Sequence, residues 1–189
     1  MFKRVGVLAL ALLLSLVAAQ DAESTIRAKC AAEWPGDAQM QAFCQRMQRD
    51  AVAELQQLDR RSGGIPDEAY RVASGRCATD WPTDFSMQAF CLKEQIEGYQ
   101  AVTRGPYSPL VDVKPEEALV ITQRCSLDWP HDYSMQAFCQ RQQVEGLAFL
   151  RNRPATVPAS TWERAVAACE WDWPNDFSMQ AFCVRRAFE

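Results

Sequence analysis

Eight cysteines are the residues of this chain best suited to covalent chemistry, and their spacing is regular. They fall into four pairs with 13 residues between the members of each pair. The pairs are Cys30 with Cys44, Cys77 with Cys91, Cys125 with Cys139, and Cys169 with Cys183. An even number of cysteines favours a disulfide framework over thiolate metal sites, and the Cys-x-x-Cys motif of thiol oxidoreductases is absent. Although eight cysteines allow 105 pairings, the constant spacing predicts one disulfide within each pair.

Paired carboxylates are the second candidate for chemistry. An acidic residue lies three positions after the first cysteine of each pair, and an aspartate follows four positions later. These residues are Glu33 and Asp37, Asp80 and Asp84, Asp128 and Asp132, and Asp172 and Asp176. Two carboxylates near a turn could bind calcium or act as general acid and base on a glycan. We instead expect the second aspartate to cap a helix, and the first to face Gln88, Gln136 or Gln180 across the turn. The first acid still needs a donor from protein or ligand, because a carboxylate is unfavourable in the last helical turn.

Aromatic residues recur beside these acids. Each of Trp81, Trp129 and Trp173 directly follows the first acid of its pair. Exposed tryptophans would stack on sugars or peptides, whereas their helical spacing from the cysteines predicts small buried cores. In the third repeat Ala118, Ile121, Cys125 and Trp129 are predicted to share one stripe that buries the cysteine and the tryptophan. The exposure of Trp81 and Trp129 distinguishes the two interpretations.

A repeat must position these residues. The segment from Cys77 to Cys91 recurs from Cys125 to Cys139 and from Cys169 to Cys183, and a weaker copy runs from Cys30 to Cys44. The starts lie 47, 48 and 44 residues apart, so the fixed cysteine spacing belongs to the repeated unit. The weak copy has Ala38 and Gln39 where the others have an aromatic residue and serine, as expected of a terminal repeat that caps an array.

The pattern of helix signals predicts two helices for each repeat. Starts are predicted at Pro66-Asp67-Glu68, at Pro115-Glu116-Glu117, and at a capping box from Ser160 to Glu163. The Trp-Pro step ends that first helix, and a second helix is expected from Phe85 to about Thr103, with equivalents in the other repeats. Gly98 and Gly146 inside the second helix indicate close approach by a neighbouring backbone. The fold class is therefore all-α: four disulfide-stapled helical hairpins in tandem, forming a short solenoid-like array. The predicted boundaries are 20–60 for the degenerate first repeat, then 66–104, 114–152 and 159–189.

The amino-terminal residues predict export. Lys3 and Arg4 precede an apolar run from Val5 to Ala19, which is typical of a secretory signal peptide over residues 1–19, with an uncut anchor as the alternative. Cleavage after Ala19 leaves 18 basic and 24 acidic residues, a net charge of −6. Nucleic acid is therefore not an expected partner, and no membrane insertion is expected after cleavage. We expect a periplasmic or secreted protein.

The run Asp-Trp-Pro-x-Asp-Phe-Ser-Met-Gln-Ala-Phe-Cys resembles a motif of uncharacterised exported proteins of Gram-negative bacteria, which implies no activity. The plan as a whole is similar in architecture to disulfide-linked helical repeats of the Sel1 type, which implies binding. Repeated units multiply one surface and offer no single catalytic constellation, so we expect a non-catalytic binding or scaffolding protein without cofactors. Its partner would be a protein or glycan of the cell envelope. The alternatives are a protein that engages cell-wall polysaccharide, with or without hydrolysis, and a thiol-redox or metal-handling protein, which would have free or easily reduced cysteines.

Overall fold

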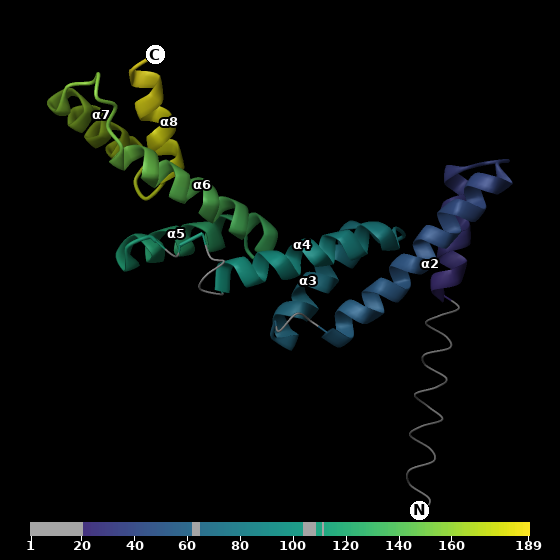
Figure 1. Ribbon diagram of the computed structural model, residues 1–189. Helices are drawn as coiled ribbons and strands as arrows, with labels where there is room; N and C mark the ends of the chain where they lie inside the picture. The colour runs from purple at the N-terminus through teal and green to yellow at the C-terminus, as the bar shows by residue number, and fades with distance from the viewer. Residues whose placement is uncertain (1–20, 62–64, 104–108, 111) are drawn as a thin grey trace, which may run out of the picture. The chain divides into compact units, whose positions relative to one another are not determined.

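The computed structural model describes residues 21–61, 65–103, 109–110 and 112–189, and their regular structure is entirely helical (Figure 1). The predicted signal peptide lies outside these residues. A first helix covers residues 21–33. The helices that follow are α2 (Ala38–Arg61), α3 (Asp67–Asp80), α4 (Phe85–Thr103), α5 (Pro115–Asp128), α6 (Tyr133–Arg151), α7 (Ala159–Asp172) and α8 (Phe177–Ala187). The all-α prediction is confirmed, and the second helix of the second repeat has the predicted bounds.

Disulfides join the helices two by two. The four bonds link Cys30 to Cys44, Cys77 to Cys91, Cys125 to Cys139 and Cys169 to Cys183, with Cα–Cα distances of 5.6 to 5.8 Å. We name the resulting units hairpin 1 (residues 21–33 with α2), hairpin 2 (α3 with α4), hairpin 3 (α5 with α6) and hairpin 4 (α7 with α8). All eight cysteines are thereby paired, as predicted. Each bond closes a loop of 14 residues, which the chain-entropy model equates with about 3 kcal/mol.

Local signals set most helix ends. Helix α5 begins at Pro115, whose fixed φ and missing N–H suit a first helical position. Helix α3 ends at Asp80, directly before the Trp-Pro step that disfavours helical angles. The predicted capping box at Ser160 is wrong, because α7 begins at Ala159 after Pro158 and has no side-chain cap. Proline thus starts this helix by its backbone geometry.

In three of the four hairpins, the turn between the two helices contains a left-handed residue. Its third position is occupied by Gly36 with φ 80°, by His131 with φ 62° and by Asn175 with φ 61°. Glycine lacks a Cβ, and Asn and His are enriched at positive φ because their side chains tolerate it. His131 therefore occupies a left-handed turn position, which is Thr83 in hairpin 2.

Each compact core is built around a disulfide. Ile26 with Cys30 and Cys44 forms the core of hairpin 1, and Ile121 with Cys125 and Cys139 forms that of hairpin 3. A third cluster consists of Trp162, Cys169 and Val184 in hairpin 4. Because these clusters are small, the covalent bond replaces apolar area that each hairpin is too short to bury.

The chain divides into two compact units, Met1–Gly64 with Ser74–Lys93, and Ile65–Ala73 with Glu94–Glu189. The first unit therefore holds hairpin 1 with the turn and disulfide of hairpin 2, and the second holds hairpins 3 and 4 with the start of α3 and the end of α4. Among the described helices, none is both long and apolar enough to cross a bilayer.

Candidate functional site

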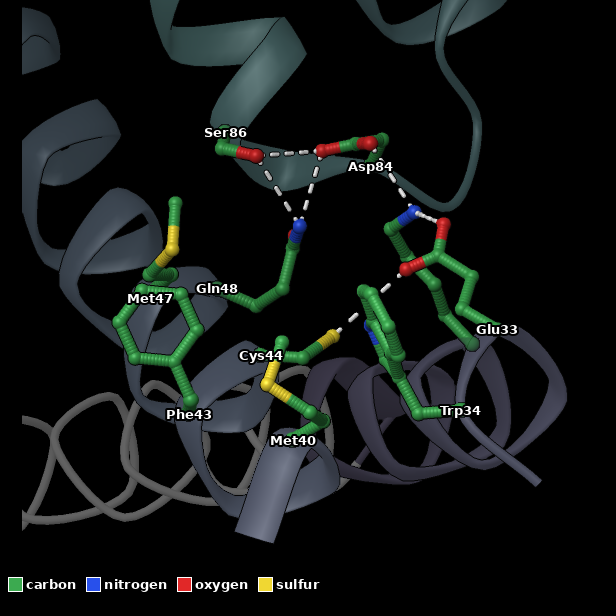
Figure 2. A pocket seen from close by; sticks show the side chains of 10 residues that line it. Glu33, Trp34, Met40, Phe43, Cys44, Met47, Gln48, Asp84 and Ser86 are labelled. Atoms are coloured by element: carbon green, nitrogen blue, oxygen red, sulfur yellow. Dashed lines mark hydrogen bonds and ion pairs between the residues drawn. The ribbon is translucent and has the colours of Figure 1, made fainter. Parts of the chain in front are cut away.

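The cap of one hairpin is shared with the hairpin before it. In the first unit, Asp84 Oδ1 accepts a hydrogen bond from the backbone N–H of Met87 at 3.1 Å, which caps α4. The same oxygen accepts from Gln48 Nε2 of α2 at 2.9 Å and from Ser86 Oγ at 2.6 Å (Figure 2). Gln48 Oε1 in turn accepts from the backbone N–H of Phe85 at 2.7 Å. One glutamine thus joins the body of α2 to the first turn of α4.

The second unit repeats this arrangement twice. Gln95 Nε2 donates to Asp132 Oδ1 at 2.8 Å, and Gln143 Nε2 donates to Asp176 Oδ1 at 2.9 Å. Each glutamine also accepts from the backbone N–H that follows the aspartate. These glutamines lie four residues after the second cysteine, outside the 15-residue motif, and sequence analysis missed them. The recurrence of a glutamine at that position in three repeats could have indicated that these residues share a role.

A basic residue directly before the first cysteine reinforces the junction. Lys29 Nζ lies 3.0 Å from Asp84 Oδ2 and also pairs with Glu33. Arg124 lies 2.7 Å from Asp176 Oδ2. A single cation therefore connects its own hairpin to the cap of the following one. We call the set of basic residue, glutamine and capping aspartate the interlock.

The interlock holds Asp84 and Asp176 ionised. Burial alone would raise the pKa of Asp84, but hydrogen bonds from Gln48, Ser86 and Lys29 outweigh it and hold this pKa well below its usual range. The same opposition of burial and hydrogen bonding lowers the pKa of Asp176. The pKa of Lys29 is raised, because its hydrogen bonds to the two carboxylates outweigh the effect of burial. An aspartate held in this way cannot serve as a general acid near neutral pH.

The first acid of each pair has a different partner from the one expected. Asp80 lies 3.6 Å from Arg76, and Asp128 lies 3.4 Å from Arg124, so protein cations supply the donor that the end of the helix requires. The expected glutamine partners instead donate to the backbone oxygen of the tryptophan at the turn, at 2.7 to 2.8 Å, in the pairs Gln88 with Trp81, Gln136 with Trp129 and Gln180 with Trp173. These glutamines therefore cap the preceding helix. Asp172 has no such cation, because Ala168 occupies the corresponding position.

The aromatic residue after each capping aspartate belongs to the neighbouring hairpin. Phe85 packs against the Ile26 cluster of hairpin 1, and Phe177 packs against the Ile121 cluster of hairpin 3. A Cβ added to Gly146 would lie 2.4 Å from the carbonyl oxygen of Phe177, and one added to Gly98 would lie 2.5 Å from the backbone of Tyr133. The close approach predicted from these glycines is confirmed.

The tryptophans of the repeated Trp-Pro steps are not in the cores. Trp34, Trp81, Trp129 and Trp173 are each 40 to 42% exposed. A phenylalanine directly before the second cysteine is also exposed in every hairpin, at Phe43, Phe90, Phe138 and Phe182. The buried stripe predicted for hairpin 3 is right for Ile121 and Cys125 and wrong for Trp129. Because the turn carries the indole beyond the end of the helix, helical spacing overestimated its burial.

In the first unit, exposed aromatic residues and residues of the interlock line one cavity of about 210 Å³ (Figure 2). Its apolar lining comes from Trp34, Phe43 and two methionines, Met40 and Met47. Lys29, Glu33, Gln48, Asp84 and Ser86 form its polar lining. The cavity thus places an exposed indole beside the interlock of hairpins 1 and 2. We call it the junction groove.

Comparison with known proteins gives no assignment. No protein-family model, no curated protein and no solved structure matches this chain. The tandem of disulfide-linked helical hairpins is consistent with the architecture of Sel1-type repeats, and its four disulfides indicate an oxidising, extracytoplasmic environment. Within the described residues, no cluster of three or more His, Cys, Asp or Glu side chains is arranged to hold a metal ion.

Proposed function

We propose that this chain is a non-catalytic, extracytoplasmic protein that binds an extended polysaccharide through the tryptophan and phenylalanine side chains that its four hairpins expose. The carrying observation is the equal exposure, 40 to 42%, of one tryptophan at the same place in every hairpin. An indole face left open to water stacks well on the C–H face of a sugar ring. Four such faces on one chain would each bind weakly and together bind strongly, because the second contact is intramolecular.

The state of the carboxylates supports binding without hydrolysis. A glycoside hydrolase needs one carboxylic acid that is protonated near neutral pH and a second that is free to act as base or nucleophile. Asp84 and Asp176 are ionised and already accept the hydrogen bonds of the interlock. Asp80 and Asp128 lie beside arginines. The paired acids of the sequence are therefore better explained as residues that cap helices and connect neighbouring hairpins than as a catalytic pair.

A second candidate is a protein partner at hairpins 3 and 4. Leu127 and Trp171 occupy the same position of their repeats and are 79% and 86% exposed. A shallow cavity beside Trp171 is lined by Ala167, Glu170 and Pro174. Exposed apolar side chains of this size favour a protein contact. A Trp171→Ala variant therefore tests the contribution of this surface to binding and leaves the repeated tryptophans unchanged.

Retention on insoluble polysaccharides tests the proposal. The disulfide-bonded protein is sedimented with peptidoglycan, chitin and cellulose, and compared with a variant in which Trp34, Trp81, Trp129 and Trp173 are all changed to alanine. We expect the unchanged protein to be retained by at least one polysaccharide and the variant to lose about a hundredfold in apparent affinity, because avidity is lost with its contacts. Trp171→Ala serves as the matched control and should bind normally. Equal retention of the quadruple variant, or no retention of the unchanged protein, would contradict the proposal.

A further inference from the structure

The polar side of the junction groove has one donor and one acceptor that the interlock does not use. The ammonium group of Lys29 has three N–H donors and contacts two carboxylates, those of Glu33 and Asp84. One N–H therefore remains, on a side chain that is only 11% exposed and lines the groove. Glu33 Oε2 lies 3.8 Å from Cys44 Sγ, which carries no hydrogen because it is disulfide-bonded. That carboxylate oxygen can accept a hydrogen bond from a ligand.

Gln48 and Asp84, the polar groups that the interlock uses in the groove, are occupied. Gln48 donates to Asp84 and Ser86 and accepts from Phe85. Asp84 accepts from four partners. A ligand consequently meets one cationic donor and one anionic acceptor, held side by side because Lys29 and Glu33 form an ion pair on the same helix. The group that complements this pair is an uncharged amide, whose C=O accepts and whose N–H donates.

The apolar side of the groove defines what carries the amide. Trp34 presents an indole that is 40% exposed, and Figure 2 shows its ring beside Met40. Phe43 and Met47 complete the apolar lining. A cavity of about 210 Å³ is smaller than the usual ligand pocket, which is about 300–1,000 Å³, so it holds one residue of a longer chain. A sugar ring against the indole with a methyl group against the thioethers satisfies this lining.

We propose that the junction groove of hairpins 1 and 2 recognises the acetamido group of an N-acetylated amino sugar. Lys29 donates to the acetamido carbonyl, Glu33 Oε2 accepts from the acetamido N–H, and Trp34 stacks on the ring. The inference rests on the proposed function and adds a specificity to it. A peptide amide offers the same donor and acceptor, but the stacking surface and the single-residue volume favour the sugar.

Hairpin 4 provides an internal control. Its tryptophan, Trp173, is exposed to the same degree as Trp34, and its first acid is Asp172. The basic residue is missing, because Ala168 stands where hairpin 1 has Lys29. Hairpin 4 therefore has the stacking surface without the paired donor and acceptor, and acetamido recognition is not assigned to it.

Calorimetry of the whole disulfide-bonded chain tests this assignment with two soluble probes of equal length, an N-acetylglucosamine oligomer and a glucose oligomer. We expect the acetylated oligomer to bind at least about tenfold more tightly, because a site built to hydrogen-bond a group discriminates against its absence. Glu33→Ala should remove this preference while the weak binding of the glucose oligomer persists, and Trp34→Ala should weaken both. Asp172→Ala should change neither. Glu33 is 47% exposed and does not contact the capping aspartate in the described structure, so its variant retains the interlock.

The other outcomes of these binding experiments each contradict a different claim. Equal binding of both oligomers, or a preference that survives Glu33→Ala, overturns the acetamido assignment and leaves polysaccharide binding intact. Failure of both oligomers, together with failure on insoluble polysaccharides, overturns the proposed function itself. If neither oligomer binds but a peptide carrying N-acetyl-lysine does so in a Glu33-dependent manner, the groove is a peptide site, and the sugar assignment is wrong.

Discussion

Hairpins 3 and 4 have nearly the same motif and differ in what surrounds it. Hairpin 3 has Arg124 before its first cysteine and Gln143 four residues after its second, and both contact Asp176 of hairpin 4. Hairpin 4 has Ala168 and Ala187 at those two positions. Two sets of residues therefore have separate roles within one repeat. The motif builds a hairpin, whereas the residues outside it build a junction to the following hairpin.

Hairpin 1 lacks the residues that contact a preceding hairpin in the other repeats. Hairpins 2 to 4 follow their capping aspartate with an aromatic residue and a serine, and these contact the preceding hairpin. In hairpin 1 the same positions are Ala38 and Gln39. Among the described residues, the Asp37 side chain accepts only the cap bond from Met40 N–H, at 3.0 Å. Hairpin 1 therefore lacks the residues that receive a preceding hairpin in the other three; its predicted role as a cap of the array stays a prediction. Substitutions at junctions should therefore be costly, and equivalent ones at unjoined positions mild.

The largest effect is expected at Gly146. A methyl group there would lie 2.4 Å from the carbonyl oxygen of Phe177, so Gly146→Ala must separate α6 from α8 and should lower the free energy of unfolding by about 3 kcal/mol. Gly75 lies within α3 with nothing inside 4 Å of an added Cβ. Gly75→Ala should accordingly stabilise by about 0.5–1 kcal/mol through helix propensity. Chemical denaturation of both variants makes the comparison, and equal effects would refute the junction at Gly146.

A smaller effect is expected at the capping aspartates. Asp176→Ala removes a cap and leaves Gln143 and Arg124 without their acceptor, so a loss of about 2–3 kcal/mol is expected. Asp37→Ala removes a cap alone and should cost about 1 kcal/mol. Thermal melting under non-reducing conditions measures both. If the two variants melt alike, the interlock adds nothing to stability beyond capping.

The smallest expected effect is a gain in stability, at Gln140. Gln140 is fully buried next to Cys139, and its Oε1 makes no hydrogen bond to the described residues. The corresponding position is Leu92 in hairpin 2 and Val184 in hairpin 4, both buried. Gln140→Leu should therefore raise the free energy of unfolding by about 1 kcal/mol, because the desolvation cost of an unpaired amide is removed. A fall in stability measured by urea denaturation would show that Gln140 has a partner role in hairpin 3.

The hairpins and their disulfides could be predicted because their determinants are local. The constant cysteine spacing, the Trp-Pro step and the prolines at the starts of α3 and α5 each act within a few residues of themselves. The glycines of α4 and α6 were informative for a similar reason, since a glycine inside a helix indicates a close neighbour. What could not be predicted is which neighbour, because Gln48, Gln95 and Gln143 pair with aspartates more than 30 residues away.

The candidate site was harder to predict than the fold. The acidic pairs attracted a chemical interpretation, yet their partners are cations and amides contributed by other segments. The exposure of the tryptophans was mispredicted because helical periodicity was extended past the last helical residue into the turn. The groove itself depends on Lys29 and Met47, which lie outside the repeated motif and have different residues in the other hairpins.

The order of the disulfides has a consequence for biogenesis. Each cysteine pairs with the next one along the chain, 14 residues on, and no bond spans two hairpins. A chain threaded amino terminus first into an oxidising compartment would therefore present every native partner before the cysteines of the following hairpin emerge. Oxidation in the order of emergence yields only correct bonds, so maturation requires an oxidant and no disulfide isomerase.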